Sequence, residues 1–164
     1  MRVLSIQYNH VRNLKNQKIS FCAPIQVFYG KNGQGKTSIL EAIYFAGTGL
    51  SFRTRHTSEM ITYTEDELSC FLEYQDQFSK KSLAVSIEKD KKFFFFLGKK
   101  ISQMEFYGNV NMIFYIPEDA MLINGSPSLR RLFIDREISQ TDSFYLHQLK
   151  KFSHLLKIRN KYLK

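Results

Sequence analysis

The clearest chemistry in the sequence lies in residues 30–37, which read Gly30-Lys31-Asn32-Gly33-Gln34-Gly35-Lys36-Thr37 and match the pattern G-x-x-x-x-G-K-[ST] in full. The glycines allow successive backbone N–H groups to turn toward phosphate oxygens, and a helix beginning at Thr37 would add the positive end of its dipole. Lys36 is suited to the β- and γ-phosphates, and the Thr37 hydroxyl is suited to bind Mg²⁺. We call residues 30–37 the P-loop and predict that all eight bind a nucleoside triphosphate.

The sequence also indicates whether the nucleotide is ATP or GTP. A guanine-reading site is expected to carry N-K-x-D, whereas the Asn-Lys pair at 160–161 is followed by Tyr-Leu. ATP, with Mg²⁺, is therefore the expected cofactor. Hydrolysis would also need an acidic pair, and the candidates are Glu118 and Asp119, which follow an apolar run at 112–116. Because Pro117 interrupts that run, capping of the next helix is the alternative role for both acids.

The P-loop requires a strand before it and a helix after it. The apolar run at 25–29 predicts a buried strand, and residues 37–46 predict a helix with Ile39, Leu40 and Tyr44 on its apolar face. Further strands are predicted at 2–8, 18–21, 68–74, 82–88, 92–97 and 112–116, those between 68 and 97 forming an antiparallel meander, and helices are predicted from about 128 and from 142.

Charge is the unusual feature of the composition. The chain has 24 Lys and Arg against 15 Asp and Glu, a net charge of +9, which favours a polyanionic partner such as nucleic acid. Arg53 and Arg55 are the main candidates for DNA phosphate contacts, and His56, Arg130 and Arg131 are further candidates. Lysines also punctuate the meander, where protection of sheet edges is the alternative role.

Other classes are disfavoured by simple patterns. The apolar runs fall far short of the roughly 20 residues that cross a bilayer, and the N-terminus reads as a strand rather than a signal peptide, so a cytoplasmic protein without a membrane partner is predicted. Cys22 and Cys70 lie far apart without metal-ligand spacing, which indicates neither a disulfide framework nor a zinc site. Both cysteines are expected to be buried.

A longer pattern resembles a known family. Residues 117–135 read PEDAMLINGSPSLRRLFID and resemble the signature of the RecF family of bacterial recombination mediators. Shorter matches agree: residues 11–13 are similar to an early Phe-Arg-Asn, residues 33–44 to the family's P-loop and helix, and residues 49–54 to its Gly-x-Ser-Phe-Arg-Thr. The resemblance covers the whole chain and is weakest across the meander.

The resemblance implies an α/β fold, a P-loop ABC-type ATPase head related to the SMC proteins with an antiparallel strand meander, followed by the start of a helical coiled-coil lobe. It implies an ATP-dependent homodimer that clamps single-stranded or gapped duplex DNA, with a RecR-like mediator as partner, in recombinational repair, replication-fork maintenance and the SOS response. Arg12 is expected to approach the nucleotide phosphates, by analogy with the matching arginine of related heads. The alternative for Arg12 is a solvated turn residue.

The expected domains are an ATPase lobe at 1–119 and the first part of a helical lobe at 120–164. A heptad seam is still running at Lys164, so we expect the sequence to be a fragment cut inside a long helix. In the RecF family the Ser-Gly-Gly-like signature and the true acidic pair follow the helical lobe. We therefore expect no catalytic residue here, at most weak nucleotide binding and no hydrolysis by the fragment, and weak DNA-dependent ATPase activity in the complete protein.

Two other functions share the P-loop. A phosphotransferase acting on a small acceptor would use Glu118, Asp119 and the arginines, and the ATPase head of another SMC-like protein would differ in the length of its coiled coil.

Overall fold

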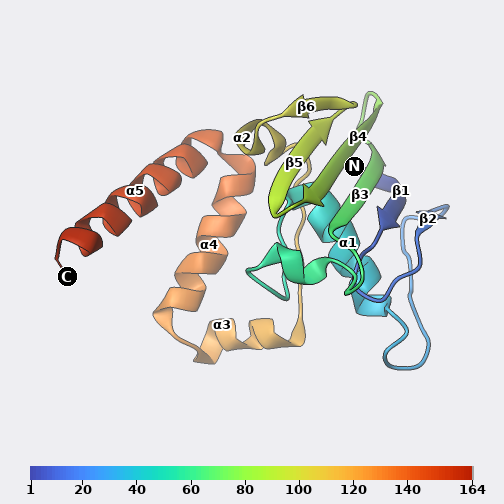
Figure 1. Ribbon diagram of the computed structural model, residues 1–164, viewed down its shortest axis with the longest axis horizontal. Helices are drawn as coiled ribbons and strands as arrows, with labels where there is room; N and C mark the ends of the chain where they lie inside the picture. The colour runs from blue at the N-terminus through green and yellow to red at the C-terminus, as the bar shows by residue number, and fades with distance from the viewer. Residues whose placement is uncertain (164) are drawn as a thin grey trace. The chain divides into compact units, whose positions relative to one another are not determined.

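The computed structural model describes residues 1–163, with Glu118 described by its backbone alone (Figure 1). The chain divides into two compact units, the first spanning Met1–Phe106 and the second beginning at Tyr107. From the sequence, the helical lobe is predicted to start at residue 120, and that boundary stays a prediction.

A six-stranded sheet with the order β2-β1-β3-β4-β5-β6 forms the first unit. The strands are β1 (Arg2–Asn9), β2 (Gln17–Ser20), β3 (Glu67–Gln75), β4 (Lys80–Glu88), β5 (Lys91–Phe96) and β6 (Lys99–Ile101). Every neighbouring pair is antiparallel, which confirms the predicted meander; β6 was not predicted.

Alternating burial explains how the sheet packs. In β3 and β4 every second side chain is buried, including Leu72 and Val85, as expected for strands with one face on a core. The helix α1 (Lys36–Thr48) contacts β1, β3 and β4 and covers this sheet (Figure 1). Phe94 of β5 is also buried, with its ring centroid 5.0 Å from that of Phe106 in the short helix α2 (Gln103–Phe106).

The face that α1 buries differs from the predicted one. Tyr44 is buried as expected, but Leu40 is 41% exposed, and the fully buried positions include Glu41, Ala42 and Phe45. The expectation was wrong because it followed the spacing of the large apolar residues alone. The Glu41 carboxylate is buried because arginine side chains compensate its charge, as described below, and this turns the Ala42–Phe45 side of the helix toward the sheet.

Two predicted strands are absent from the described residues. The segments 25–29 and 112–116 are irregular, and Val27 and Ile113 are 78% and 88% exposed. A strand forms only where a neighbour completes its ladder of hydrogen bonds, and no described strand lies beside either segment. Instead, the Met112 backbone bonds a side chain: its N–H donates to Gln140 Oε1 (2.8 Å), and its carbonyl accepts from Gln140 Nε2 (3.2 Å).

Helices make up the second unit. They are the 3₁₀ helix η2 (Pro117–Ala120), α3 (Met121–Asn124), α4 (Pro127–Thr141) and α5 (Ser143–Tyr162). The predicted cap at Asp142 is confirmed, since its carboxylate accepts the backbone N–H groups of Phe144 and Tyr145. The Tyr145 hydroxyl donates to Asp135 at 2.6 Å and joins α5 to α4.

The cysteines differ from each other. Cys70 is fully buried, and burial raises the pKa of its thiol, as expected for a core residue. Cys22 is exposed, contrary to the prediction, because it lies beyond the end of β2, where no sheet covers it.

The C-terminal end of α1 depends on Gly49. This residue adopts φ +69°, and a Cβ there would collide with the Phe94 ring. Lys92 donates from Nζ to the Gly49 carbonyl (3.0 Å), and burial lowers the pKa of that amine.

Gly49→Ala should therefore destabilise the first unit by about 2–4 kcal/mol, the sum of backbone strain and a displaced core ring. Gly98→Ala is the matched control, because Gly98 has φ +76° with open space around it and should lose only the backbone contribution, about 1 kcal/mol. Urea unfolding of both variants measures the difference. Equal losses would show that Phe94 does not constrain this position.

Candidate nucleotide-binding site

The P-loop runs directly into the first turn of α1. Gly30, Gly33 and Gly35 all have positive φ, and Gly35, at +87°, is the N-cap residue of the helix. A Cβ at Gly35 would also collide with the Leu14 side chain. The chain can enter the helix at this angle only with glycine at this position.

Lys36 projects into the curve of the loop. Its Nζ lies 2.8 Å from the carbonyl oxygens of both Gly30 and Lys31, so the ammonium group is held by the backbone that surrounds it. Residues 30–34 are exposed, as is Thr37 in the first turn of α1. The backbone of this loop is therefore accessible to an anionic ligand.

Asn13 ties the P-loop to the end of β1. Its Nδ2 donates to the Gly33 carbonyl (3.0 Å), and its Oδ1 accepts from the Ser38 hydroxyl (3.3 Å). One side chain thus fixes both the loop and the helix that follows it.

Arg12 makes a two-pronged contact with α1. Its Nη2 and Nε lie 2.8 and 3.1 Å from the two carboxylate oxygens of Glu41, and its Nη1 donates to the Glu59 carbonyl at 2.6 Å. The Arg12 side chain is 22% exposed and that of Glu41 is fully buried. Arg12 thus lies in a turn with its guanidinium bonded to Glu41 and to the Glu59 carbonyl, and its phosphate contact stays a prediction.

Glu41 is also bound by the loop that follows α1. The Ser51 hydroxyl donates to Glu41 Oε1 at 2.5 Å and accepts the backbone N–H groups of Arg53 and Thr54. Arg53 Nη1 lies 3.5 Å from Glu41 Oε2, and the Arg53 side chain is 46% exposed.

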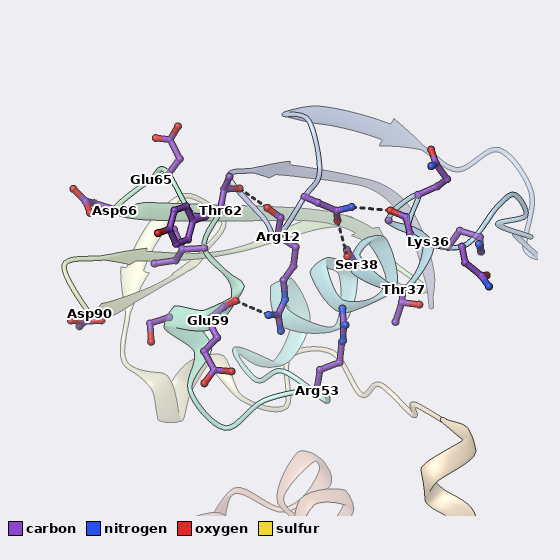
Figure 2. A pocket seen from close by; sticks show the side chains of 18 of the residues that line it. Arg12, Lys36, Thr37, Ser38, Arg53, Glu59, Thr62, Glu65, Asp66 and Asp90 are labelled. Carbon is purple, nitrogen blue, oxygen red and sulfur yellow. Dashed lines mark hydrogen bonds between the residues drawn. The ribbon is translucent and has the colours of Figure 1, made fainter.

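These groups border one cavity of about 1090 Å³ (Figure 2). Arg12, Lys36, Thr37 and Arg53 line it together with the 3₁₀ helix η1 (Thr57–Met60), the segment 61–66 and the β4–β5 turn. The carboxylates of Glu65, Asp66 and Asp90 lie on the side away from Lys36 and Thr37. Arg12, Lys36 and Arg53 thus line the cavity near the P-loop, while Lys89 lines it next to Asp90 in the β4–β5 turn.

The other predicted residues lie elsewhere. Arg55 and His56 are exposed on the loop after Arg53 and do not line the cavity. Arg130 donates to the Gly125 carbonyl at 3.0 Å, and Arg131 is exposed.

The Asp119 carboxylate accepts the Ile116 backbone N–H at 2.9 Å, a local contact at the start of η2. The Glu118 side chain lies outside the described residues. Among the described residues, no group of three or more His, Cys, Asp or Glu could hold a metal ion.

Sequence reasoning missed three of the residues that build this site. Glu41, Ser51 and Asn13 received no site role, although all three fall in the motifs that carry the RecF resemblance. A signal for Glu41 was present, since it is the single charged residue in the run Ser38–Ala46. A lone carboxylate on a helix that packs against a sheet requires a cationic partner.

Comparison with known proteins shows which family the chain belongs to. A family model described as an AAA domain matches residues 5–163, and the chain belongs to this family. Its particular relatives are DNA replication and repair proteins RecF, and the predicted resemblance to RecF is confirmed. The RecF of Ligilactobacillus salivarius (strain UCC118) is 36% identical over all of this chain, and that of Streptococcus pneumoniae (strain 70585) is 40% identical over 93% of it.

Solved structures agree. The recombination mediator protein RecF with ATP, described in the RecFOR pathway, matches 99% of this chain with a TM-score of 0.92 and 32% identity. A structure from work on ATP-driven dimerization of SMC ATPases matches 83% of the chain and 99% of its own length, with a TM-score of 0.63 and 18% identity. The predicted fold class is therefore confirmed.

The chain spans 44% of the length of both the L. salivarius relative and the RecF structure. Within residues 1–163, none of the helices combines the length and the hydropathy that a membrane crossing needs.

We expect Asn13→Ala to loosen the P-loop. Losing the bond to the Gly33 carbonyl should increase the fast backbone motion of residues 33–35 and lower their ¹⁵N order parameters. Asn9→Ala is the control, because Asn9 Nδ2 makes a comparable 3.0 Å bond to Ser69 within the sheet. Unchanged order parameters at 33–35 would mean that Asn13 does not restrain the loop.

Proposed function

We propose that this chain binds Mg²⁺–ATP and forms the nucleotide-binding part of an ATPase head that acts on DNA in replication and repair. The observation that carries this proposal is the P-loop, with Lys36 held inside its curve, opening into a cavity that Arg12 and Arg53 also line. The relatives named RecF, which match 93–100% of the chain, supply the DNA-repair context.

The residues at the P-loop end of the cavity fit a triphosphate. Arg12, Lys36 and Arg53, together with the exposed backbone of the loop, suit an anion. The carboxylates of Glu65, Asp66 and Asp90 at the other end would repel one. The volume is at the upper end of the roughly 300–1000 Å³ typical of small-molecule sites, which leaves room for a nucleoside beyond the phosphates. The P-loop residues 30–37 and Arg12 are the proposed ATP contacts.

Magnesium is the finer part of the cofactor proposal. The Thr37 hydroxyl, exposed in the first turn of α1, is the proposed Mg²⁺ ligand. When bound, Mg²⁺ neutralises charge on the β- and γ-phosphates. Thr37 would hold the ion beside the phosphates, while Lys36 and the loop amides orient them.

The partners are proposed from the relatives. The RecF structure is described in the RecFOR pathway, and the SMC structure comes from work on ATP-driven dimerization and DNA-stimulated activation. We propose that the complete protein forms an ATP-dependent homodimer, clamps single-stranded or gapped duplex DNA and uses a RecR-like partner. Its ATPase activity would be weak and DNA-dependent.

Lys36→Ala should weaken binding of Mg²⁺–ATP about 10- to 100-fold, because it removes charge-assisted hydrogen bonds to phosphate. Thr37→Ala should instead abolish the gain in ATP affinity that Mg²⁺ provides. Calorimetric titration of the chain with ATP, with and without Mg²⁺, measures both effects. Lys18→Ala is the control, because Lys18 pairs with Glu73 outside the cavity; ATP binding that is insensitive to Lys36 would refute the proposed site.

Arg55→Glu offers a test of the DNA contact in the complete gene product. Because Arg55 is exposed and does not line the cavity, the change should lower ATP-dependent DNA affinity about tenfold and leave ATP affinity unchanged. Lys99→Glu in the edge strand β6 is the matched charge reversal and should have little effect if the meander lysines only protect the sheet. Fluorescence anisotropy with gapped DNA measures both variants, and DNA affinity that is unaltered by Arg55→Glu would contradict the assignment.

A further inference from the structure

The Glu41 carboxylate lies at the junction of three segments. It is carried by α1 and receives hydrogen bonds from Arg12, in the turn after β1, and from Ser51, in the loop after α1. It is fully buried, so these contacts replace water around both oxygens.

Each carboxylate oxygen is shared between the two partner segments. Oε1 accepts from Arg12 Nη2 and from the Ser51 hydroxyl, while Oε2 accepts from Arg12 Nε and lies 3.5 Å from Arg53 Nη1. A shift of either arginine therefore changes the electrostatic environment of the other through the same two atoms.

The balance of charge leaves this cluster cationic. One buried carboxylate faces two guanidinium groups, and both arginines line the cavity that contains the P-loop. The contacts to Glu41 and to the Glu59 carbonyl use three of the five N–H groups of Arg12, so the same guanidinium retains two donors for a phosphate oxygen.

We propose that Glu41 is a positioning residue that couples nucleotide binding at Arg12 to the position of the loop 51–54, which carries Arg53. This inference rests on the proposed function, because the ligand that acts on Arg12 is the ATP phosphate. A phosphate beside Arg12 competes with Glu41 for the guanidinium. The carboxylate then binds Ser51 and Arg53 more strongly, and the position of the loop 51–54 changes.

Side-chain NMR of the ¹⁵N-labelled chain tests this coupling directly. The Nε–H signals of Arg12 and Arg53 are assigned with the Arg→Lys variants, and Mg²⁺–ATP is titrated while the Gly33 amide reports on occupancy of the P-loop. In the wild-type chain both arginine signals should shift with the same titration midpoint as Gly33. In Glu41→Gln at saturating ATP, the Arg12 shift should remain and the Arg53 shift should fall at least threefold.

Glu73→Gln is the matched control, because Glu73 also accepts from a serine hydroxyl, that of Ser5, and pairs with a cation, Lys18. It lies on β3 away from the cavity and should leave both arginine responses unchanged. A merely structural role for Glu41 would not remove the Arg53 response selectively.

Ser51→Ala addresses the possibility that Glu41→Gln fails to fold with a buried charge unbalanced. It keeps the carboxylate and deletes the hydroxyl that donates to Glu41 and accepts the backbone N–H groups of Arg53 and Thr54. The Arg53 response should therefore fall while the Arg12 response stays. Ser5→Ala is its control.

The outcomes separate the two proposals. No Gly33 shift at any ATP concentration would refute the proposed function. A Gly33 shift without an Arg53 shift in the wild-type chain, or an Arg53 shift that is undiminished in Glu41→Gln and Ser51→Ala, would refute the coupling alone.

Discussion

The fold of the first unit depends on a carboxylate that is removed completely from water. An isolated buried carboxylate costs several kcal/mol, and only close cationic and hydroxyl partners offset that cost. The partners of Glu41 come from the turn after β1 and from the loop after α1, so both segments must be in place before the helix can pack on the sheet. The buried face of α1 thus includes a charged residue together with its partners, whereas Leu40 on the predicted apolar face is 41% exposed.

The same requirement fixes the geometry of the P-loop. Arg12 itself has φ +53°, and the next two residues, Asn13 and Leu14, contact the P-loop and the start of α1. Arg12 binds Glu41, Asn13 binds Gly33 and Ser38, and Leu14 packs against Gly35. Three consecutive side chains therefore place the helix and its preceding loop against the end of β1.

The features that depend on local patterns could be predicted from the sequence. Alternation identified β3 and β4, glycine spacing identified the P-loop, and the carboxylate of Asp142 identified the start of α5. The failed strand predictions at 25–29 and 112–116 concern pairing, whereas β6, which pairs with its neighbour β5, was missed. The segments 25–29 and 112–116 have the composition of strands but no strand beside them in the described residues, and composition carries no information about pairing.

Only part of the candidate site could be predicted, because only part of it lies in one stretch of the sequence. The P-loop residues are consecutive, so their pattern is visible in one short stretch. Glu41 and its partners span 12–53, and their relation emerges only from folding. The resemblance to RecF pointed to the segments that contain Arg12, Glu41 and Ser51, but it did not indicate that Arg12 and Ser51 both bind the Glu41 carboxylate.

The strand order has a kinetic consequence. From β3 to β6 each strand pairs with the next one through a short turn, whereas the β1–β3 pairing spans residues 10–66, the stretch that contains the P-loop, α1 and Glu41. Closing a long loop costs more entropy and slows folding more than forming adjacent hairpins. We therefore expect the hairpins to form early and the cavity to assemble last. Local opening of the β1–β3 ladder would dismantle the cavity while the meander stays folded.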